Sequence, residues 1–279
     1  MKTAAVVKIV IWSVVALLLL GLFLSIHYTD KSKIFSIVSG WSEGDLEVLR
    51  VQSFPVENID SIDLKWSSGT FIISPTDGNQ IIVTEKANRE LTEGEMLQIS
   101  VDNGKIRMEQ GTQISRIFIF SFGYNQVNEI RLPEKQYREL KARMSSGKLI
   151  IDKLDCNRVD IGLTSGLVEM SAVNASDLLL DMTSGKADLE GSFDDLYVDS
   201  TSGSIYIKSE QAPSAMFIDI TSGKAVITIP ENEGFVVGKR ITSGVFRSDF
   251  AIDDFGRYKD GENRYRINMT SGVVELKRK

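Results

Sequence analysis

The chain has 279 residues and a formal net charge of −6, from 32 basic and 38 acidic side chains. This balance excludes the strongly basic surface with which many proteins bind nucleic acid. The chain has one histidine, His27, and one cysteine, Cys156, which excludes an internal disulfide, histidine-rich metal centres and catalysis by Ser/His or Cys/His pairs in the rest of the chain.

The first element in chain order is an uncharged apolar run from Ile9 to Ile26. At about 1.5 Å per residue, a helix of this length covers roughly 27 Å, close to the thickness of a hydrocarbon core. We predict a transmembrane anchor at residues 9–28 after a cytoplasmic N-terminus at residues 1–8, because Lys2 and Lys8 favour the cytoplasmic side. The chain is then a single-pass protein of the cell membrane with an extracytoplasmic C-terminal region. A cleaved signal peptide is the alternative.

A polar linker is expected at residues 29–47, followed by an irregular β cap or early coils at residues 48–140. Alternating apolar residues predict strands in this cap at Glu47–Gln52, Ser61–Trp66, Thr70–Ser74, Gln80–Glu85, Leu97–Val101 and Lys105–Glu109. Asn103-Gly104 is typical of a type I′ hairpin between the last two of these strands. Arg89–Glu95 is a loop or a helical turn, and Arg116–Phe122 is a very apolar strand or loop.

A repeated Ser/Thr-Ser-Gly triplet dominates the remainder of the chain and predicts regular repeats over residues 141–279. From Gly147 onward the spacings between its glycines are 19, 19, 18, 20, 21 and 28 residues, and the longest interval holds an insertion at Asp253–Asn263. The eight glycines of the triplet are Gly69, Gly147, Gly166, Gly185, Gly203, Gly223, Gly244 and Gly272.

Apolar residues alternate with polar ones on both sides of each glycine, at positions −5 and −3 before it and +2 and +4 after it. A period of two predicts strands with one buried face, so each repeat is a strand, a turn and a second strand. A repeat of this size cannot bury its own apolar face, but stacked repeats can. The sequence therefore predicts an all-β fold, a parallel β-helix or solenoid-like stack with coils of about 19 residues.

The triplet is expected to form the corner of each coil. Glycine tolerates a positive φ, and a serine that points inward at the corner can bond to the backbone of its own or a neighbouring coil. The serines expected to do so are Ser146, Ser165, Ser184, Ser202, Ser222, Ser243 and Ser271. A serine nucleophile would need a base, and none recurs beside the triplet, so no catalytic residue is predicted.

The repeats resemble a known family. Strand-loop segments such as Ile130-Arg131-Leu132-Pro133 and Ile227-Thr228-Ile229-Pro230 precede Ser-Gly strands in the same pattern. Over roughly residues 50–279 the chain resembles the bacterial "putative adhesin" β-strand-repeat family, a domain of unknown function. With its N-terminal anchor it is similar to LiaG-like envelope-stress proteins. The resemblance implies the β-repeat fold and provides no catalytic motif to carry over.

Three further groups of residues have two interpretations each. Asp181, Asp199 and Asp219 share position −4 and form either a calcium site or a solvent-facing ladder balanced by Lys186 and Lys224. Five aromatic residues form either a sugar- or protein-binding strip or ordinary packing contacts: Tyr197, Tyr206, Phe235, Tyr258 and Tyr265. Lys277–Lys279 either protects the edge of the last coil or contacts lipid or a wall polymer.

The expected function is that of a non-enzymatic, membrane-anchored extracytoplasmic scaffold or accessory in the bacterial cell envelope, in envelope stress or adhesion. Its partners would be the membrane and an envelope protein or cell-wall polymer, with no cofactor, no metal and no nucleic acid. The alternatives are a polysaccharide-binding or polysaccharide-active β-helix, and a structural solenoid that assembles with itself. Functional residues are expected on the outward face or where the repeat is interrupted, at residues 75–140 and 250–263.

Overall fold

The computed structural model describes residues 46–111 and 125–279, and they belong to one compact unit, Leu46–Lys279. Every regular element of these residues is a β-strand, and among them no helix is long and apolar enough to cross a membrane. The predicted cytoplasmic segment 1–8, anchor 9–28 and apolar segment 116–122 lie outside the described residues, as does most of the predicted linker.

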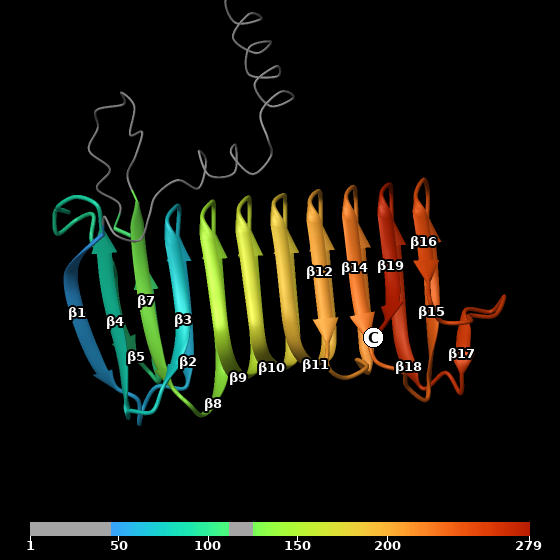
Figure 1. Cartoon of the computed structure of the whole chain (residues 1–279), viewed down its shortest axis with the longest axis horizontal. Coiled ribbons are helices and arrows are strands. Elements are labelled where there is room, and N and C mark those ends of the chain that lie inside the picture. Colours follow the sequence, from blue (N-terminus) through green and yellow to red (C-terminus); the bar gives the residue numbers. More distant parts are fainter. Residues whose placement is uncertain (1–45, 112–124) are drawn as a thin grey trace, which may run out of the picture. The chain divides into compact units, whose positions relative to one another are not determined.

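The repeating unit is a coil in which a strand leads into a Ser/Thr-Ser-Gly turn and a strand leads away from it. Successive turns lie side by side along one edge of the stack, visible at the top of Figure 1. We call the strands that lead away from the turns the first sheet and the strands that lead into them the second sheet. Three long strands bend and pass from the first sheet to the second: β9 (Lys148–Leu163), β10 (Leu167–Met182) and β11 (Lys186–Ser200).

The first sheet joins strands that are far apart in the chain. Its order is β1 (Glu47–Pro55), β4 (Gln80–Ala87), β7 (Gln126–Pro133), β3 (Thr70–Thr76), the first parts of β9, β10 and β11, β12 (Ser204–Ser209), β14 (Lys224–Ile229), β19 (Val273–Arg278) and β16 (Val245–Ser248). All its pairings are parallel except β1–β4 and β4–β7, which close one end of the stack.

The second sheet follows the same coils. Its order is β5 (Gln98–Asp102), β6 (Lys105–Glu109), β2 (Ser61–Trp66), β8 (Gln136–Met144), the second parts of β9, β10 and β11, β13 (Ala215–Ile220), β18 (Asn263–Met269), β15 (Gly234–Ile241) and β17 (Arg257–Lys259). Its antiparallel pairings, β5–β6 and β15–β17, are again at the two ends. The all-β, mostly parallel stack agrees with the predicted fold class.

The order of coils in space departs from their order in the chain at both ends. The coil formed by β18 and β19, around Gly272, inserts between the coils of Gly223 and Gly244. At the other end the coil of β2 and β3, around Gly69, lies between the pair β6 and β7 and the coil of Gly147. The prediction placed Lys277–Lys279 on the last coil, and this is wrong, because the β16 coil lies beyond β19 and pairs with it at Val273–Leu276.

The predicted strands of the N-terminal region agree closely with the structure. Ser61–Trp66 and Lys105–Glu109 have the predicted bounds, and the others differ by a few residues at their ends. Asn103 and Gly104 both have a positive φ, 49° and 78°, as a type I′ hairpin requires. Arg89–Glu95 is a loop whose Thr92–Glu95 turn is capped by the Glu95 carboxylate, which accepts a hydrogen bond from the Thr92 N–H at 3.0 Å.

The core is the interior of the coils, filled by the alternating apolar residues of both sheets. The column two residues after each glycine includes Leu149, Val168, Ala187, Ile205 and Val274, all 0–1% exposed. Parallel pairing in register places identical repeat positions on top of one another. Outward-facing repeat positions form columns in the same way, and these columns determine what the surface can bind.

Candidate functional site

The glycines of the triplet form a column along the turns. The N–H after each glycine donates to the carbonyl of the neighbouring glycine, for example Lys186 N to Gly166 O at 2.9 Å. Gly185 has a φ of +112°, and a Cβ there would lie 2.3 Å from the Gly166 oxygen. Six others also have a positive φ: Gly69, Gly147, Gly166, Gly203, Gly223 and Gly272. Gly244, at the end of the column, does not share this φ. The column is a structural feature, because its polar atoms bond to one another.

The middle serines of the triplets do not point inward, so that prediction is wrong. Most of them, including Ser165 and Ser222, are exposed, and Ser184 and Ser271 are half-buried. Four residues at each turn, from position −2 to +1, lie outside the core between the buried positions −3 and +2. Backbone groups make the contacts between turns. Within residues 46–111 and 125–279, Ser184 is the one middle serine whose hydroxyl bonds to a neighbouring coil, and it donates to Thr164 O at 3.1 Å.

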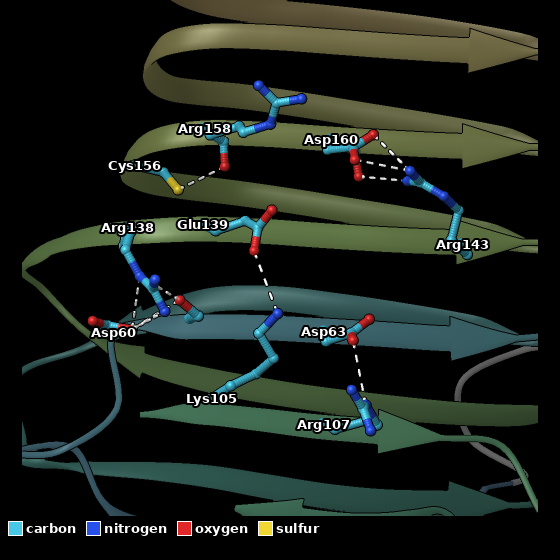
Figure 2. A network of polar contacts seen from close by, with 11 residues as sticks. Asp60, Asp63, Lys105, Arg107, Arg138, Glu139, Arg143, Cys156, Arg158 and Asp160 are labelled. Atoms are coloured by element: carbon cyan, nitrogen blue, oxygen red, sulfur yellow. Dashed lines mark hydrogen bonds and ion pairs between the residues drawn. The ribbon is translucent and has the colours of Figure 1, made fainter. Parts of the chain in front are cut away.

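The outer face of the second sheet divides into two parts with different chemistry. Toward the N-terminal end of the stack, opposite charges pair between neighbouring strands or across one intervening strand (Figure 2). Arg107 contacts Asp63 at 3.3 Å, and Lys105 contacts Glu139 at 3.5 Å. Each of these partly exposed pairs neutralises its own two charges and contributes little free energy.

Arg143 marks the boundary between the two parts. It shares position −4 with Gly162 and Asp181 in register. Because Gly162 has no side chain, the Arg143 side chain crosses it, and a Cβ at Gly162 would lie 2.9 Å from Arg143 Cδ. The guanidinium then binds the Asp160 carboxylate with two bonds of 2.9 and 2.8 Å, seen in Figure 2. Asp181, the next residue at position −4, therefore lies beside a hollow.

Beyond Arg143 the column continues with three aspartates. Asp181, Asp199 and Asp219 lie in register on neighbouring strands. Asp219 accepts a hydrogen bond from Asn268 Nδ2 at 3.2 Å, whereas Asp181 and Asp199 make no hydrogen bond or ion pair within residues 46–111 and 125–279. Burial, and then the negative charges of Asp219 and Asp181, raise the pKa of Asp199.

The lysines that were expected to balance this ladder are used elsewhere. Lys186 pairs with Asp188 at 3.3 Å, and Lys224 pairs with Glu275 at 3.7 Å. The interpretation of a charge-balanced ladder is therefore wrong. No group of three His, Cys, Asp or Glu side chains in the described part of the chain is arranged to hold a metal ion, so the aspartates alone do not form a calcium site.

An apolar and aromatic column runs beside the aspartates, two residues earlier in each repeat. Leu179, Tyr197 and Phe217 lie in register on β10, β11 and β13. Tyr197 is 41% exposed, and Phe217 is half-buried. Together with the aspartates they line an open groove of about 370 Å³, whose other polar residues are Arg143 and Asp160. We call this groove, with Asp219 at its end, the acidic-aromatic strip.

A second hollow of about 350 Å³ adjoins the strip and shares Arg143 and Asp181 with it. It lies over the turns, where Ser145, Thr164 and Thr183 contribute to its lining. The two hollows extend the polar surface from the strip to the edge that carries the turns. An elongated ligand on the second sheet could therefore contact carboxylates, an aromatic column and hydroxyl groups in succession.

The predicted aromatic strip is corrected in part. Phe235, Tyr258 and Tyr265 are buried, at 0%, 7% and 4% exposure, and pack together at the C-terminal end of the stack. Phe235 stacks on Tyr265 with ring centroids 4.6 Å apart. Tyr206 lies on the first sheet, where the Lys186 ammonium is 5.5 Å from its ring. Of the five predicted aromatics, Tyr197 alone belongs to the acidic-aromatic strip.

Two residues of the strip, Leu179 and Phe217, were not predicted. Their signal is present in the sequence, because position −6 of three successive repeats carries a large apolar residue on the outward-facing side of the alternation.

Cys156 is a core residue with 0% exposure, and burial raises the pKa of its thiol to about 11. It is consequently an inert thiol at neutral pH.

The geometry of the strip suits binding better than bond-making chemistry. Its groups repeat in register on rigid, fully paired strands, and an aromatic face can stack on an apolar ligand surface while carboxylates accept hydrogen bonds. The residues that line it include the carboxylates of Asp160, Asp181 and Asp199 and no Ser, Thr, Cys, Lys or His side chain.

Comparison with solved structures places this chain beside three proteins of similar extent. A "putative cell adhesion protein" from Clostridium sporogenes is 14% identical, with a TM-score of 0.44 over 84% of this chain and 100% of that one. A "putative adhesin" from Bacteroides fragilis is 10% identical, with a TM-score of 0.49 over 84% and 98%. A "Putative lipid binding protein" from Parabacteroides distasonis is 13% identical, with a TM-score of 0.39 over 85% and 98%. No curated protein matches the chain.

A family model matches the repeats directly. The Toastrack DUF4097 model matches twice, at residues 59–192 and at residues 137–277. The two matches overlap in the middle of the stack and together include nearly all the described coils. The resemblance that was read from the Thr-Ser-Gly pattern is thereby confirmed, and the chain belongs to the Toastrack DUF4097 family.

Proposed function

We propose that this chain is a non-enzymatic, membrane-anchored binding scaffold of the cell envelope, and that the acidic-aromatic strip is its ligand surface. The apolar segment 9–28 would anchor it with the β stack on the extracytoplasmic side. The ligand class that fits best is a hydroxyl-rich envelope polymer, that is, a polysaccharide.

One observation carries the proposal. Asp181 and Asp199 have no hydrogen bond or ion pair within the described residues, whereas Arg143 and Asp160, on the two preceding strands of the same face, pair with each other at 2.8 Å. Three like charges in register repel one another, which costs stability. A ligand that donates hydrogen bonds to these carboxylates would relieve that cost, so the arrangement has a physical reason if it is used in binding.

The adjacent column favours sugars among hydrogen-bond donors. The face of a sugar ring carries C–H groups that pack on an aromatic ring, while its hydroxyls donate to carboxylates at the ring edge. Tyr197 and Phe217 provide the ring faces, and Asp199 and Asp181 provide the acceptors. The repeat of these groups from coil to coil suits a polymer, because successive units of the ligand can make equivalent contacts.

The test is co-sedimentation of the full-length chain, held in detergent micelles, with purified cell-wall polysaccharide. Tyr197→Ala and Phe217→Ala are expected to weaken binding about tenfold each, which corresponds to about 1.4 kcal/mol. The matched control is Tyr206→Ala, because Tyr206 is an outward aromatic of a neighbouring strand on the first sheet. Equal binding by wild type and both strip variants would contradict the proposed surface.

The topology has its own test. Protease added to intact cells should remove the β stack, and the remaining N-terminal fragment should stay in the membrane fraction. A stack that is protected in intact cells but digested after lysis would overturn the extracytoplasmic placement. A wholly soluble full-length chain would overturn the anchor.

A second candidate function is polysaccharide cleavage, and the raised pKa of Asp199 favours it. A glycoside hydrolase needs one carboxyl with a raised pKa and a second carboxylate nearby, and Asp181 occupies the neighbouring strand in register. Asp199→Asn distinguishes the two functions. A scaffold releases no soluble sugar, either as wild type or as the variant, whereas an enzyme releases sugar as wild type and loses that activity as the variant.

A further inference from the structure

The ends of the stack, rather than its faces, carry most of the exposed apolar surface. Seven large apolar side chains are exposed among residues 46–111 and 125–279, and six of them lie at the two ends. Val48, Val51 and Val101 lie on β1 and β5, with exposures of 57%, 59% and 46%. Ile241, Val245 and Phe255 lie at the opposite end, with exposures of 36%, 42% and 90%.

Both ends also carry strand edges with unpaired backbone groups. Within the described residues β1 pairs with β4 alone, and β5 pairs with β6 alone. At the other end β16 pairs with β19 alone, and β17 covers β15 at Gly234–Val236 but not at residues 238–241. Such edges are templates for the addition of another chain.

The directions of the edge strands are compatible with continuation of both sheets by a second copy. Because β1 is antiparallel to β4, and β4 is antiparallel to β7, β1 runs in the direction of β3 and hence of β16. A copy shifted along the stack would pair its β1 with β16 in parallel. Its β5, which is antiparallel to β6, would pair with β15 in antiparallel.

The levels of the edges agree as well. In the register of the first sheet, Val48 of β1 pairs with Lys86, Lys86 pairs with Val127, and Val127 pairs with Thr70. Val48 therefore lies at the same height along the strands as Thr70, one residue after Gly69. Val245 of β16 lies one residue after Gly244. These two valines would therefore face each other across the junction between two copies.

The strands β15 and β16 and the turn between them are positively charged. Residues 238–248 contain Lys239, Arg240 and Arg247 and no acidic residue, although Arg247 pairs with Glu275 at 3.4 Å and Asp249, Asp253 and Asp254 follow in the chain. The opposite end, over residues 88–104, contains Arg89 as its single basic residue, and that side chain pairs with Glu95 at 2.7 Å. Glu90, Glu93 and Asp102 are exposed there. Opposite charges at the rims favour the association of unlike ends and disfavour the association of like ends.

We propose that the chain associates head to tail with further copies of itself, the β1 and β5 end of one copy adding to the β15 and β16 end of the next. This interface is heterologous, because it joins two different surfaces of the chain. Unless the rotation between successive copies closes a ring, such an interface produces linear filaments. The proposal goes beyond the function of the acidic-aromatic strip and does not depend on it. A filament would align the strips of successive copies.

The test is disulfide cross-linking of the full-length chain in detergent micelles. Val48→Cys and Val245→Cys are made singly and together, and Cys156 stays in place because it is buried. After mild oxidation the double variant should give a ladder of dimers, trimers and higher multimers on a non-reducing gel. Each single variant alone should remain monomeric, and an equimolar mixture of the two should stop at dimers.

Two other outcomes would overturn the proposal. A monomeric double variant would mean that the two ends do not meet, and efficient dimers of either single variant would indicate a two-fold interface between like ends. Lys239→Glu with Arg240→Glu should reduce the yield of multimers about tenfold. Glu90→Lys with Glu93→Lys in the same chain should restore it. Lys141→Glu, in the middle of the second sheet, is the matched control and should have no effect.

Discussion

The glycine column makes a quantitative prediction at Gly185. Replacement by alanine places a Cβ 2.3 Å from the Gly166 oxygen at a φ of +112°. A side chain at such a φ costs about 1–3 kcal/mol. The backbone must also move away from Gly166, which weakens the hydrogen bond from Lys186 N, worth about 0.5–1.5 kcal/mol. The expected loss is about 2–4 kcal/mol, or about 4–16 °C in Tm for a domain of this size.

The assay is thermal unfolding of the full-length chain followed by circular dichroism at the β-sheet band. Gly238→Ala is the matched control, because nothing lies within 4 Å of a Cβ at Gly238 and its φ is not positive. The free energy of unfolding of that variant should stay within about 0.5 kcal/mol of the wild-type value. If Gly185→Ala has the same Tm as Gly238→Ala and wild type, the close approach of the turns does not determine the stability of the stack, and the explanation of the triplet fails.

Three further predictions concern single side chains. Asp199→Asn should raise Tm at pH 7 by about 1 °C, because burial and the neighbouring charges of Asp219 and Asp181 raise the pKa of Asp199 in the folded state. The advantage should shrink as the pH falls from 7 and the Asp199 carboxylate of wild type becomes protonated, and a constant difference would contradict this origin. The Cys156 thiol, with its pKa raised to about 11, should resist thiol reagents at pH 8 until the chain is denatured, and labelling of the native chain would contradict its burial. Ser184→Ala should lower stability by about 0.5 kcal/mol in chemical denaturation through loss of its bond to Thr164 O, whereas Ser165→Ala should have no effect.

The repeat pattern predicted the coils well because each coil obeys the same local rules. Period-two alternation indicated which side chains enter the core, and the spacing of the glycines indicated where the chain turns. The error on the serines came from extending that alternation through the turn. Buried positions −3 and +2 are five residues apart, an odd number, so the alternation has to break between them. That parity was present in the sequence, but it does not determine where the alternation breaks, and the structure shows that all four residues from −2 to +1 lie outside the core.

The order of the coils could not be predicted in the same way. The coils of Gly223, Gly244 and Gly272 have similar triplets and similar apolar positions, so the repeat alone does not determine which two are neighbours. The long intervals before Gly147 and Gly272 indicate inserted residues, but they do not indicate which strands those residues pair with. The groove beside Asp181 was hidden for a different reason, since it depends on the direction in which Arg143 crosses Gly162.

The inserted position of β18 and β19 has a consequence for how the molecule can be made. Strands β18 and β19 follow β15 and β16 in the chain, yet they lie between these strands and the coil of Gly223. Before β18 and β19 are made, β15 pairs with β17 alone and β16 has no strand neighbour within the described residues. The coil of Gly244 can therefore join the stack only after β18 and β19 have formed. Once in place, these two strands cannot peel away as an end coil can, because each is held on both sides by other strands.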